Sequence, residues 1–447
     1  MTIEDNVGTG MITSKGADST IKLTNDSRLI IKGGTIRYTG NGTSTIYHNS
    51  TGNLEVKGGT VENTYNSNKN SAVIHSTGSG DVIVDGGTVK CNTNNSNMRV
   101  IYKDEDSNGD VIVSEGTVEA LAGTVIANNG NGNVSISGGT VEAYQGAAIY
   151  NNNIGKITIS GEAEIKSQSQ YGGTIYLNAG TADNTVLEIT GGTISNEYDY
   201  YGTAIYNNAS GKISIQGGTC IIWGKSMAMN KLPLMGALRI MASTSHTDGT
   251  YVYPVNAEAL TSDNITNYKY LKFEPATVPD APTNVTTTAG DGKATVSFTA
   301  PAFDGGSAIT GYIVKSYPGG ITATGATTEI EVTGLTNGTE YTFTVTATNG
   351  VGESPESSAS SSVIPKGNQT ITFDNPGDQD FGTELTLSAS ASSGLAVTYT
   401  SETPEVCTVT SDGKVTFLKV GTATITVSQD GNGAYNPATP VTCSFTV

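Results

Sequence analysis

"RLIIKGGTI", residues 28–36, recurs along the first half of a chain of 447 residues. Close copies are "NLEVKGGTV" (53–61), "DVIVDGGTV" (81–89), "NVSISGGTV" (133–141), "VLEITGGTI" (186–194) and "KISIQGGTC" (212–220), and degenerate ones are "DVIVSEGTV" (110–118) and "KITISGEAEI" (156–165). Marked by the Thr of each copy, or by Ala163 in the last-named one, successive copies are 23 to 30 residues apart. Recurrence of one motif at steps of this size indicates a repeat architecture.

Each copy alternates apolar and polar residues before its Gly-Gly bend. The positions six and four before the Thr are always apolar: Leu29/Ile31, Leu54/Val56, Val82/Val84, Val111/Val113, Val134/Ile136, Ile157/Ile159, Leu187/Ile189 and Ile213/Ile215. A period of two predicts a strand with one buried face. The glycines predict a sharp bend where a Cβ atom would obstruct, and a second strand starts after the Thr, at Ile36, Val61, Val89, Val118, Val141, Ile194 and Cys220.

A third strand family lies between the copies, in segments such as "STIYHN", "AAIYNN" and "TAIYNN". Its Ile column is expected to point inward, at residues 46, 74, 101, 126, 149, 175 and 205. The next column is expected to point outward: Tyr47, His75, Tyr102, Ala127, Tyr150, Tyr176 and Tyr206. Two positions on, an Asn column at 49, 129, 152, 178 and 208 is predicted to stack at a turn and satisfy its own amides.

Three short strands and three turns in about 25 residues predict one coil of a parallel β-helix, whose coils stack about 4.8 Å apart. We expect about eight coils over residues 1–225. This half resembles the right-handed parallel β-helices of bacterial surface proteins, and the handedness is implied by the resemblance alone. Residues 226–278 break the pattern, and Met227, Met229, Met235 and Met241 favour an irregular cap on the last coil, with a Met-rich ligand surface as the alternative.

Two further domains follow at the Pro-rich "VPDAPTNV". Residues 279–366 resemble a fibronectin type III domain through "KATVSFTAP", "ITGYIVKSY" and "TGLTNGTEYTFTVTATNGVGES", with Tyr341 at the tyrosine-corner position. Phe298 stands where that family usually has a core Trp. Residues 367–447 resemble a bacterial Ig-like domain through "VTYTSETPEVCTVTSDGKV" and "GTATITVSQ". The whole chain is therefore predicted to be all-β, a β-helix followed by two sandwiches, and such sandwiches usually serve as spacers.

Composition excludes several functions. A net charge of -18 with few basic residues offers no stripe for phosphate contacts, so nucleic acid is not an expected partner. No segment approaches the roughly 20 apolar residues of a membrane span. Four cysteines form no zinc or redox motif, and Cys407 and Cys443, which share the last domain, leave a bridge between them open. We expect an extracellular protein of the bacterial cell surface, and the strand-like end at Val447 suggests a piece of a longer one.

One stretch fits a calcium loop. From Asp104 to Glu115 the sequence follows D-x-D-x-N-G with a Glu at the twelfth position. Glu115 is separated from the acidic turn by a predicted core strand, so it is too far away to be the bidentate ligand of an EF-hand. What remains is a candidate calcium turn made of Asp104, Asp106, Asn108 and Asp110, with a solvated acidic loop as the alternative.

The outward tyrosines are the second candidate site, because aromatic faces stack on sugar rings. Carbohydrate-binding candidates are Tyr47, Tyr102, Tyr150, Tyr176 and Tyr206 of the column, together with Tyr198, Tyr200 and Tyr201 of the inserted "NEYDYYG". Tyr also has high strand propensity, so stacking without a ligand explains the column as well. No catalytic residues are assigned, since the acids fall in different turns and the three histidines form no constellation.

These features predict a non-enzymatic surface protein that binds carbohydrate or mediates adhesion through the β-helix face, with the sandwiches as a stalk. Its partner would be a glycan or a host or cell-surface protein, without membrane insertion by this segment, and no cofactor other than calcium is suggested. The alternatives are a polysaccharide-active β-helix enzyme, a lyase or hydrolase, and a purely structural spacer of a larger surface protein.

Overall fold

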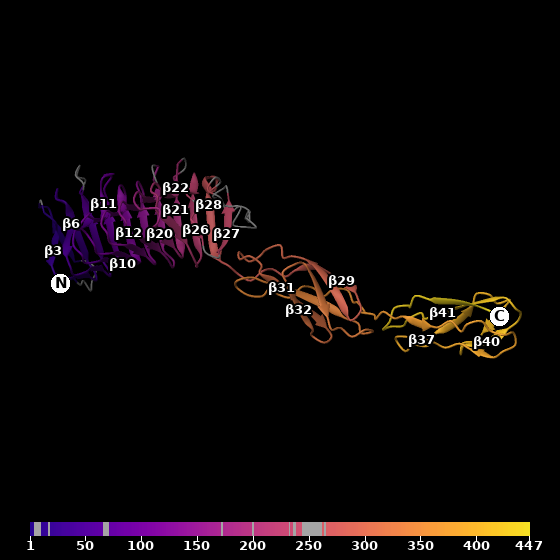
Figure 1. Ribbon diagram of the computed structural model, residues 1–447. Coiled ribbons are helices and arrows are strands. Elements are labelled where there is room, and N and C mark those ends of the chain that lie inside the picture. The colour runs from indigo at the N-terminus through magenta and orange to yellow at the C-terminus, as the bar shows by residue number, and fades with distance from the viewer. Residues whose placement is uncertain are drawn as a thin grey trace. The chain divides into compact units, whose positions relative to one another are not determined.

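The computed structural model describes residues 1–3, 10–16, 18–65, 71–170, 173–198, 201–231, 233–235, 238–243, 262 and 265–447. The chain divides into two compact units, Met1–Thr277 and Val278–Val447. The described residues are in strands, turns and one 3-10 helix, η2 (Ile265–Asn267), so the predicted all-β class is confirmed. The first unit is the predicted parallel β-helix, a solenoid of about eight turns (Figure 1).

Three strand families run through the coils of the first unit. The first, which precedes the glycine bend, is β1 (Thr2–Ile3), β4 (Leu29–Ile31), β7 (Leu54–Val56), β10 (Val82–Cys91), β12 (Val111–Ala120), β14 (Val134–Ile136), β17 (Ile157–Ile159), β20 (Thr185–Ile189), β23 (Lys212–Ile215) and β26 (Leu234–Met235). The second, which follows the bend, is β2 (Met11–Ser14), β5 (Thr35–Tyr38), β8 (Thr60–Asn63), the later halves of β10 and β12, β15 (Thr140–Ala143), β18 (Glu164–Ser167), β21 (Gly192–Asn196) and β24 (Cys220–Gly224). These two families share one sheet.

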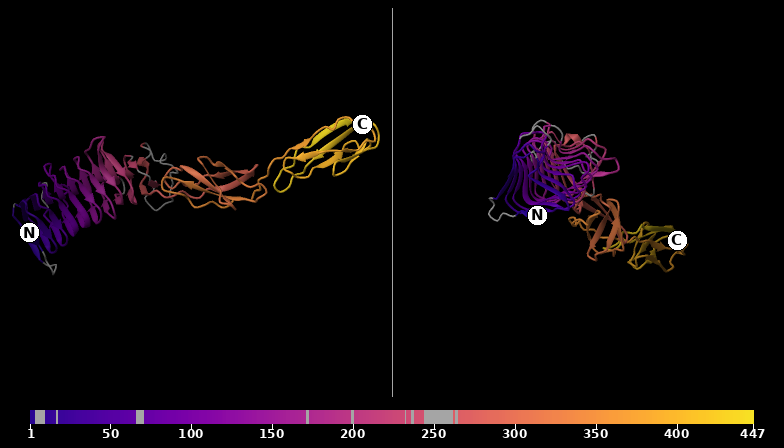
Figure 2. Two further views of the ribbon diagram at one scale, coloured as in Figure 1. Left: turned by 60° about the horizontal axis from the view of Figure 1, so that its bottom comes forward. Right: turned by 90° about the vertical axis from the view of Figure 1, so that its left-hand side faces the viewer.

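The third family forms a separate sheet of nine parallel strands. It comprises β3 (Ile21–Asn25), β6 (Ser44–Ser50), β9 (Ala72–Ser76), β11 (Arg99–Lys103), β13 (Thr124–Asn128), β16 (Ile149–Asn151), β19 (Gly173–Leu177), β22 (Thr203–Asn207) and β25 (Met227–Met229). Each strand pairs only with its equivalents on the coils before and after it. Viewed from the N-terminal side, successive coils therefore superimpose (Figure 2).

The predicted apolar columns fill the interior of the solenoid. All sixteen positions before the glycine bend and the seven isoleucines of the third family are at most 3% exposed. The strands pair in the register that the repeat predicts, with Leu29 opposite Leu54 and Ile31 opposite Val56. Burial of one continuous apolar core by stacked coils is what stabilises a solenoid, since no single coil buries its own face.

The last copy of the repeat departs from the predicted alignment. Placing Cys220 directly after the repeat Thr pairs it with Ile194, but in the structure Cys220 lies opposite Gly192 and Ile222 lies opposite Ile194. The shift is two residues, which in a strand leaves the same side chains facing inward. Cys220 and Ile222 are accordingly both fully buried.

The cap is made by antiparallel strands. After β25 and β26, strand β27 (Leu238–Ser243) pairs antiparallel with β28 (Tyr270–Pro275), and β28 pairs antiparallel with β24 of the last coil. Leu271 and Phe273 of β28 complete the core. Met229 is buried in the core, whereas the side chains of Met235 and Met241 lie outside the described part of the chain.

The second unit contains two sets of antiparallel sheets. The first set is β29 (Thr283–Ala289), β30 (Lys293–Thr299) and β33 (Glu329–Thr333) in one sheet, and β32 (Thr322–Gly325), β31 (Gly311–Tyr317) and β34 (Thr342–Thr348) in the other. The Tyr341 hydroxyl accepts a hydrogen bond of 3.1 Å from the Thr336 N–H, which makes the predicted tyrosine corner. Phe298 occupies the core and packs edge-on against Tyr312.

The second set of sheets ends the chain. It comprises the pair β35 (Ile371–Phe373) and β37 (Ala389–Ala391), the sheet of β36 (Leu385–Thr386), β40 (Lys414–Phe417) and β39 (Cys407–Val409), and the sheet of β38 (Thr398–Ser401), β41 (Thr422–Ser428) and β42 (Val441–Thr446). Cys407 and Cys443 are buried free thiols in its core, so the structure has no bridge between them.

Candidate functional site

The predicted tyrosines of the third family form one outward-facing column. Strand pairing places Tyr47 opposite His75, and Tyr102 opposite both His75 and Ala127. On the following coils, Tyr150 lies opposite Ala127, Tyr176 opposite Tyr150, and Tyr206 opposite Tyr176. The rings are half-buried. The structure thus brings five of the eight predicted aromatic residues into a single row.

Ala127 divides the row into two groups of rings. In the N-terminal group, Tyr47 and His75 meet edge to face at 5.4 Å between centroids, and His75 and Tyr102 lie 5.0 Å apart. The guanidinium carbon of Arg99 lies 4.3 Å from the centre of the Tyr102 ring, a cation–π contact. Burial lowers the pKa of His75, although Asp104, whose Oδ2 lies 3.4 Å from the ring Nε2, opposes that shift. This group is therefore occupied by its own polar contacts.

The C-terminal group is a stack. Tyr150 and Tyr176 lie 5.4 Å apart with 17° between ring planes, and Tyr176 and Tyr206 lie 5.3 Å apart with 24° between planes. Burial raises the pKa of Tyr176, and the neighbouring phenols of Tyr206 and Tyr150 add to the rise, so its hydroxyl stays protonated at neutral pH. Because the rings stack on each other, the inner faces are covered, and a row of free faces for sugars is not what the structure presents.

Part of the predicted asparagine column accompanies this stack. The Asn178 amide donates to Asn152 Oδ1 at 2.8 Å and to the Tyr150 hydroxyl at 3.2 Å, and Asn208 donates to Asn178 Oδ1 at 3.1 Å. The side-chain amides therefore satisfy one another from coil to coil, as the sequence predicts, and Asn178 also fixes the Tyr150 hydroxyl.

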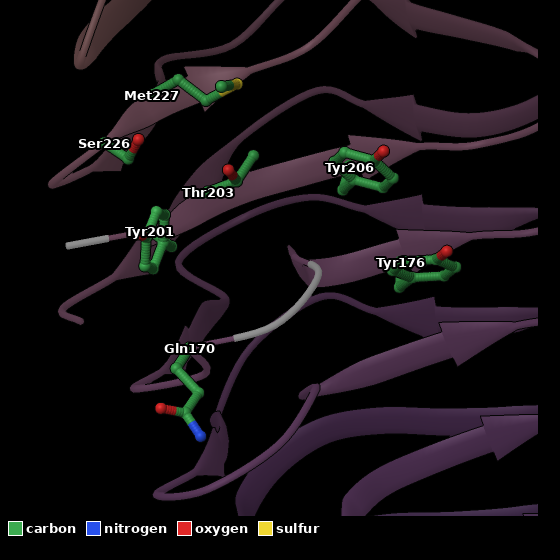
Figure 3. A pocket seen from close by; sticks show the side chains of 7 residues that line it. All are labelled: Gln170, Tyr176, Tyr201, Thr203, Tyr206, Ser226 and Met227. Atoms are coloured by element: carbon green, nitrogen blue, oxygen red, sulfur yellow. The ribbon is translucent and has the colours of Figure 1, made fainter.

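A groove of about 500 Å³ lies at the C-terminal end of the stack. It is lined by Gln170, Tyr176, Tyr201, Thr203, Tyr206, Ser226 and Met227, which come from three successive coils of the solenoid, in β19, β22 and β25 or just before them (Figure 3). Tyr201 is 70% exposed. Tyr198 is outside the lining, and its hydroxyl donates to Gln170 Oε1 at 3.0 Å. Tyr200 lies outside the described residues.

Sequence reasoning missed the non-aromatic part of this groove. Gln170, Thr203 and Ser226 come from turns or strand starts, and the repeat pattern assigns such positions no function. Their common place at the entry to the third-family strands is the only signal, and it becomes visible once β19, β22 and β25 are aligned on each other.

The candidate calcium turn is arranged differently from a metal site. Within the described residues, no three His, Cys, Asp or Glu side chains come together as a group that could hold a metal ion. Asp104 faces His75, Asn108 Oδ1 accepts from the Asn131 amide at 3.2 Å, and Asp106 is exposed. Asp104 and Asn108 thus contact other side chains, and the calcium turn stays a prediction.

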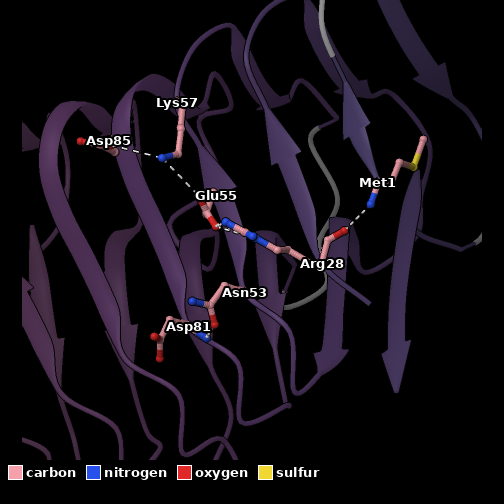
Figure 4. Close-up of polar contacts among 7 residues, drawn as sticks. All are labelled: Met1, Arg28, Asn53, Glu55, Lys57, Asp81 and Asp85. Carbon is pink, nitrogen blue, oxygen red and sulfur yellow. Dashed lines mark hydrogen bonds and ion pairs between the residues drawn. The ribbon is translucent and has the colours of Figure 1, made fainter. Parts of the chain in front are cut away.

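Asp110 belongs instead to a ladder of side-chain acceptors between coils. Asn53 Oδ1 accepts the Asp81 N–H at 3.0 Å, Asp81 Oδ1 accepts the Asp110 N–H at 2.8 Å, and Asp110 Oδ1 accepts the Asn133 N–H at 2.7 Å. Asn133 Oδ1 then accepts the Lys156 N–H at 3.0 Å. Figure 4 shows the first step, near the ion pairs of Glu55 with Arg28 and Lys57. The side chains just before β7, β10, β12 and β14 thus join neighbouring coils.

Replacing Asp110 by Ala is expected to lower the free energy of unfolding of the β-helix by about 1 kcal/mol, because the Asn133 N–H loses its acceptor. Trp223 is the chain's single tryptophan and lies in β24, so its fluorescence in a urea titration reports on this unit alone. Asp110→Asn keeps an oxygen at the same place and is expected to retain most of the stability. Equal losses in the two variants would contradict the ladder.

A buried polar column, which the sequence did not predict, lies on the inner side of the third-family sheet. His48 Nε2, Asn128 Nδ2, Asn151 Nδ2 and Asn207 Nδ2 each bond the carbonyl oxygen four residues on, at 2.8 to 3.1 Å. Lys103 occupies the same column and is 1% exposed. Its Nζ has no hydrogen-bond partner among the described residues, and burial lowers its pKa to about 8.

A second hollow of about 700 Å³ lies at the glycine bends. Glu115, Glu162 and Glu164 line it among glycine, serine and threonine residues. Lys166, outside the lining, pairs with Glu164 at 3.3 Å and with Glu142 at 3.5 Å. These carboxylates lie on the face of the glycine bends, apart from the aromatic column of the third family.

Comparison with known families identifies the two domains that follow the β-helix. The fibronectin type III family matches residues 280–363, and the bacterial Ig-like family matches residues 395–431. No curated protein matches the chain. The chain therefore combines a parallel β-helix with a fibronectin type III domain and a bacterial Ig-like domain, a combination that fits a surface or stalk protein.

Similar solved structures cover only part of the chain. A fragment of titin is 21% identical with a TM-score of 0.20, and the match covers 29% of this chain and 54% of that one. The twitchin kinase region from C. elegans is 29% identical with a TM-score of 0.19, and the match covers 20% of this chain and 17% of that one. No helix among the described residues is long and apolar enough to cross a membrane.

Proposed function

We propose that this chain is a non-enzymatic extracellular binding protein of the bacterial surface, which binds carbohydrate through its β-helix and uses the two sandwich domains as a stalk. The observation that carries the proposal is the groove beside the tyrosine stack, where exposed Tyr201 and stacked Tyr206 flank the polar side chains of Thr203 and Ser226. Apolar ring faces next to a few hydrogen-bonding groups are the chemistry that sugars require.

The stacked rings make the groove rigid. Tyr206 is held by Tyr176, which is held in turn by Tyr150, and Asn178 fixes the Tyr150 hydroxyl. A site whose groups are already in place loses little conformational entropy when a ligand binds. Extracellular location is supported by the two domain families, which are typical of surface proteins.

The first alternative is a polysaccharide-active enzyme, and Glu162 and Glu164 in the second hollow are the carboxylates it would use. Acid–base cleavage needs one carboxyl to hold a proton while the other is ionised. Glu164 is engaged in an ion pair with Lys166, which also pairs with Glu142 outside the hollow. The second alternative, a spacer without a ligand, predicts no binding at all.

Replacement of Tyr206 by Ala is expected to weaken carbohydrate binding by about tenfold, the effect of losing one aromatic contact. The measurement is a glycan array with the full chain, followed by titration calorimetry on the best ligand. Tyr144→Ala is the matched control, because Tyr144 is 40% exposed and lies outside the groove.

The outcomes separate the three functions. Binding that Tyr206→Ala weakens and Tyr144→Ala preserves supports the proposal. Release of reducing ends or unsaturated products from the bound glycan supports the enzyme. Absence of any binding or turnover leaves the spacer, and contradicts the proposal.

A further inference from the structure

The number of free ring faces limits what the groove can hold. Both faces of Tyr176 are covered, one by Tyr150 and the other by Tyr206. The next residue along this column after Tyr206 is Asn230, which directly follows the β25 pairing of Ile205 with Met229. Its amide is engaged by the backbone of Asn207, at 2.8 and 3.2 Å. Among the described residues, the stack therefore ends at Tyr206, whose outer face is not covered by another of their rings.

The remaining lining of the groove suits a small polar ring. Figure 3 shows Tyr201 and Tyr206 on either side of Thr203, with Ser226 and Met227 above them on the next coil. Hydroxyl groups of Thr203 and Ser226 and the carboxamide of Gln170 are the polar groups of the lining. A hydroxyl-rich ligand is recognised by such neutral donors and acceptors.

Charge is absent from the described lining of the groove, although the chain as a whole carries a net charge of -18. A carboxylate or sulfate on the ligand would lose hydration there without gaining a cationic partner. The acidic protein would also repel such a ligand as it approaches. An uncharged sugar avoids both costs.

We infer that the groove binds one uncharged sugar ring, at the end or on a branch of a neutral glycan, and that it does not bind a polysaccharide laid along the tyrosine column. This inference rests on the proposed function and specifies its ligand. An extended chain would need one free ring face for each sugar, whereas both faces of Tyr176 are covered and, of the rings that line the groove, Tyr206 at the end of the stack and exposed Tyr201 remain. The hydroxyls of the bound ring would meet Thr203, Ser226 and Gln170.

Titration calorimetry of the full chain with two matched series of ligands tests the inference. One series is glucose, galactose and mannose with their oligomers of up to six rings, and the other is oligogalacturonates of the same lengths. We expect binding of neutral sugars, with affinity that changes less than threefold between two and six rings. Oligogalacturonates are expected to bind at least tenfold more weakly.

Tyr201→Ala is the decisive variant, because the exposed Tyr201 side chain contributes little to folding and its loss is expected to weaken neutral-sugar binding at least tenfold. Tyr144→Ala is expected to change nothing, and Trp223 fluorescence checks that both variants are folded. Affinity that rises with each added ring, or preference for the oligogalacturonates, overturns the inference and leaves carbohydrate binding intact. Absence of binding to every ligand here and on the glycan array overturns the proposed function as well.

Discussion

Alanine in place of Gly139 is expected to lower the free energy of unfolding of the β-helix by about 3 kcal/mol or more. Gly139 is the second glycine of its repeat copy and has a φ of +69°, which costs an L-residue about 1–2 kcal/mol. Its Cβ would also lie 2.5 Å from the Gly116 carbonyl oxygen and 2.9 Å from the Glu115 carbonyl carbon. Both are backbone atoms of the preceding coil, so relief of the contact requires the coils to move apart.

Gly217→Ala is the matched control for this prediction. Gly217 has a similar φ of +66°, but a Cβ there would meet no atom within 4 Å. We expect Gly217→Ala to lower the free energy of unfolding by the conformational cost alone, about 1–2 kcal/mol. Urea titration followed by Trp223 fluorescence measures both variants, and equal losses would show that close stacking of coils at the bend contributes nothing.

The repeat predicted the fold because position along a strand determines which way a side chain points. Period-two alternation placed Leu29 and Ile31 inside, and the recurrence of the motif every 23 to 30 residues placed their equivalents on top of each other. The same reasoning was wrong by two residues in β24. Aligning Gly217-Gly218-Thr219 with the other copies predicts that Cys220 pairs with Ile194, but the strand is shifted and Cys220 pairs with Gly192.

The candidate site was predictable only in part. The sequence shows that Tyr150, Tyr176 and Tyr206 form a column, but the orientation of their rings depends on contacts across coils, and these turned the faces toward each other. The groove depends on the turns at Gln170 and Ser226, and the turns before β19, β22 and β25 differ in length. The acidic turn shows the same limit, because Asp110 bonds the backbone of a residue in the next coil.

Lys103 was also unpredictable, since its side chain occupies a column that holds His48, Asn128 and Asn151 in other coils. In the period-two alternation of β11, position 103 points inward, so a lysine there is an exception to the repeat. Its buried ammonium group has the Coulombic attraction of Asp110 and Asp81, which raises the pKa but is outweighed by desolvation. The protein therefore holds a buried charge that weakens the solenoid at neutral pH.

Lys103→Met is accordingly expected to raise the free energy of unfolding at pH 7 by about 2 kcal/mol, because methionine has a similar unbranched shape and no charge to bury. The folded-state pKa of about 8 lies below the ordinary 10.5, so the unfolded chain holds the proton in the interval between these values and the folded chain does not. The stability of the natural protein is therefore expected to rise with pH across that interval, and the rise should be missing in Lys103→Met.

Lys212→Met controls for the loss of a lysine as such, because Lys212 is exposed on β23. Urea titrations at several pH values between 7 and 10.5, followed by Trp223 fluorescence, give the free energy of unfolding of each protein. The difference between a variant and the natural protein at each pH cancels the titration of the tyrosines that all three proteins share. A Lys103→Met protein less stable than the natural one at pH 7 would mean that the amine gains a partner in solution that offsets its burial. The Lys103 column would then be a stabilising feature of the solenoid, comparable to the side-chain bonds of Asn128 and Asn151.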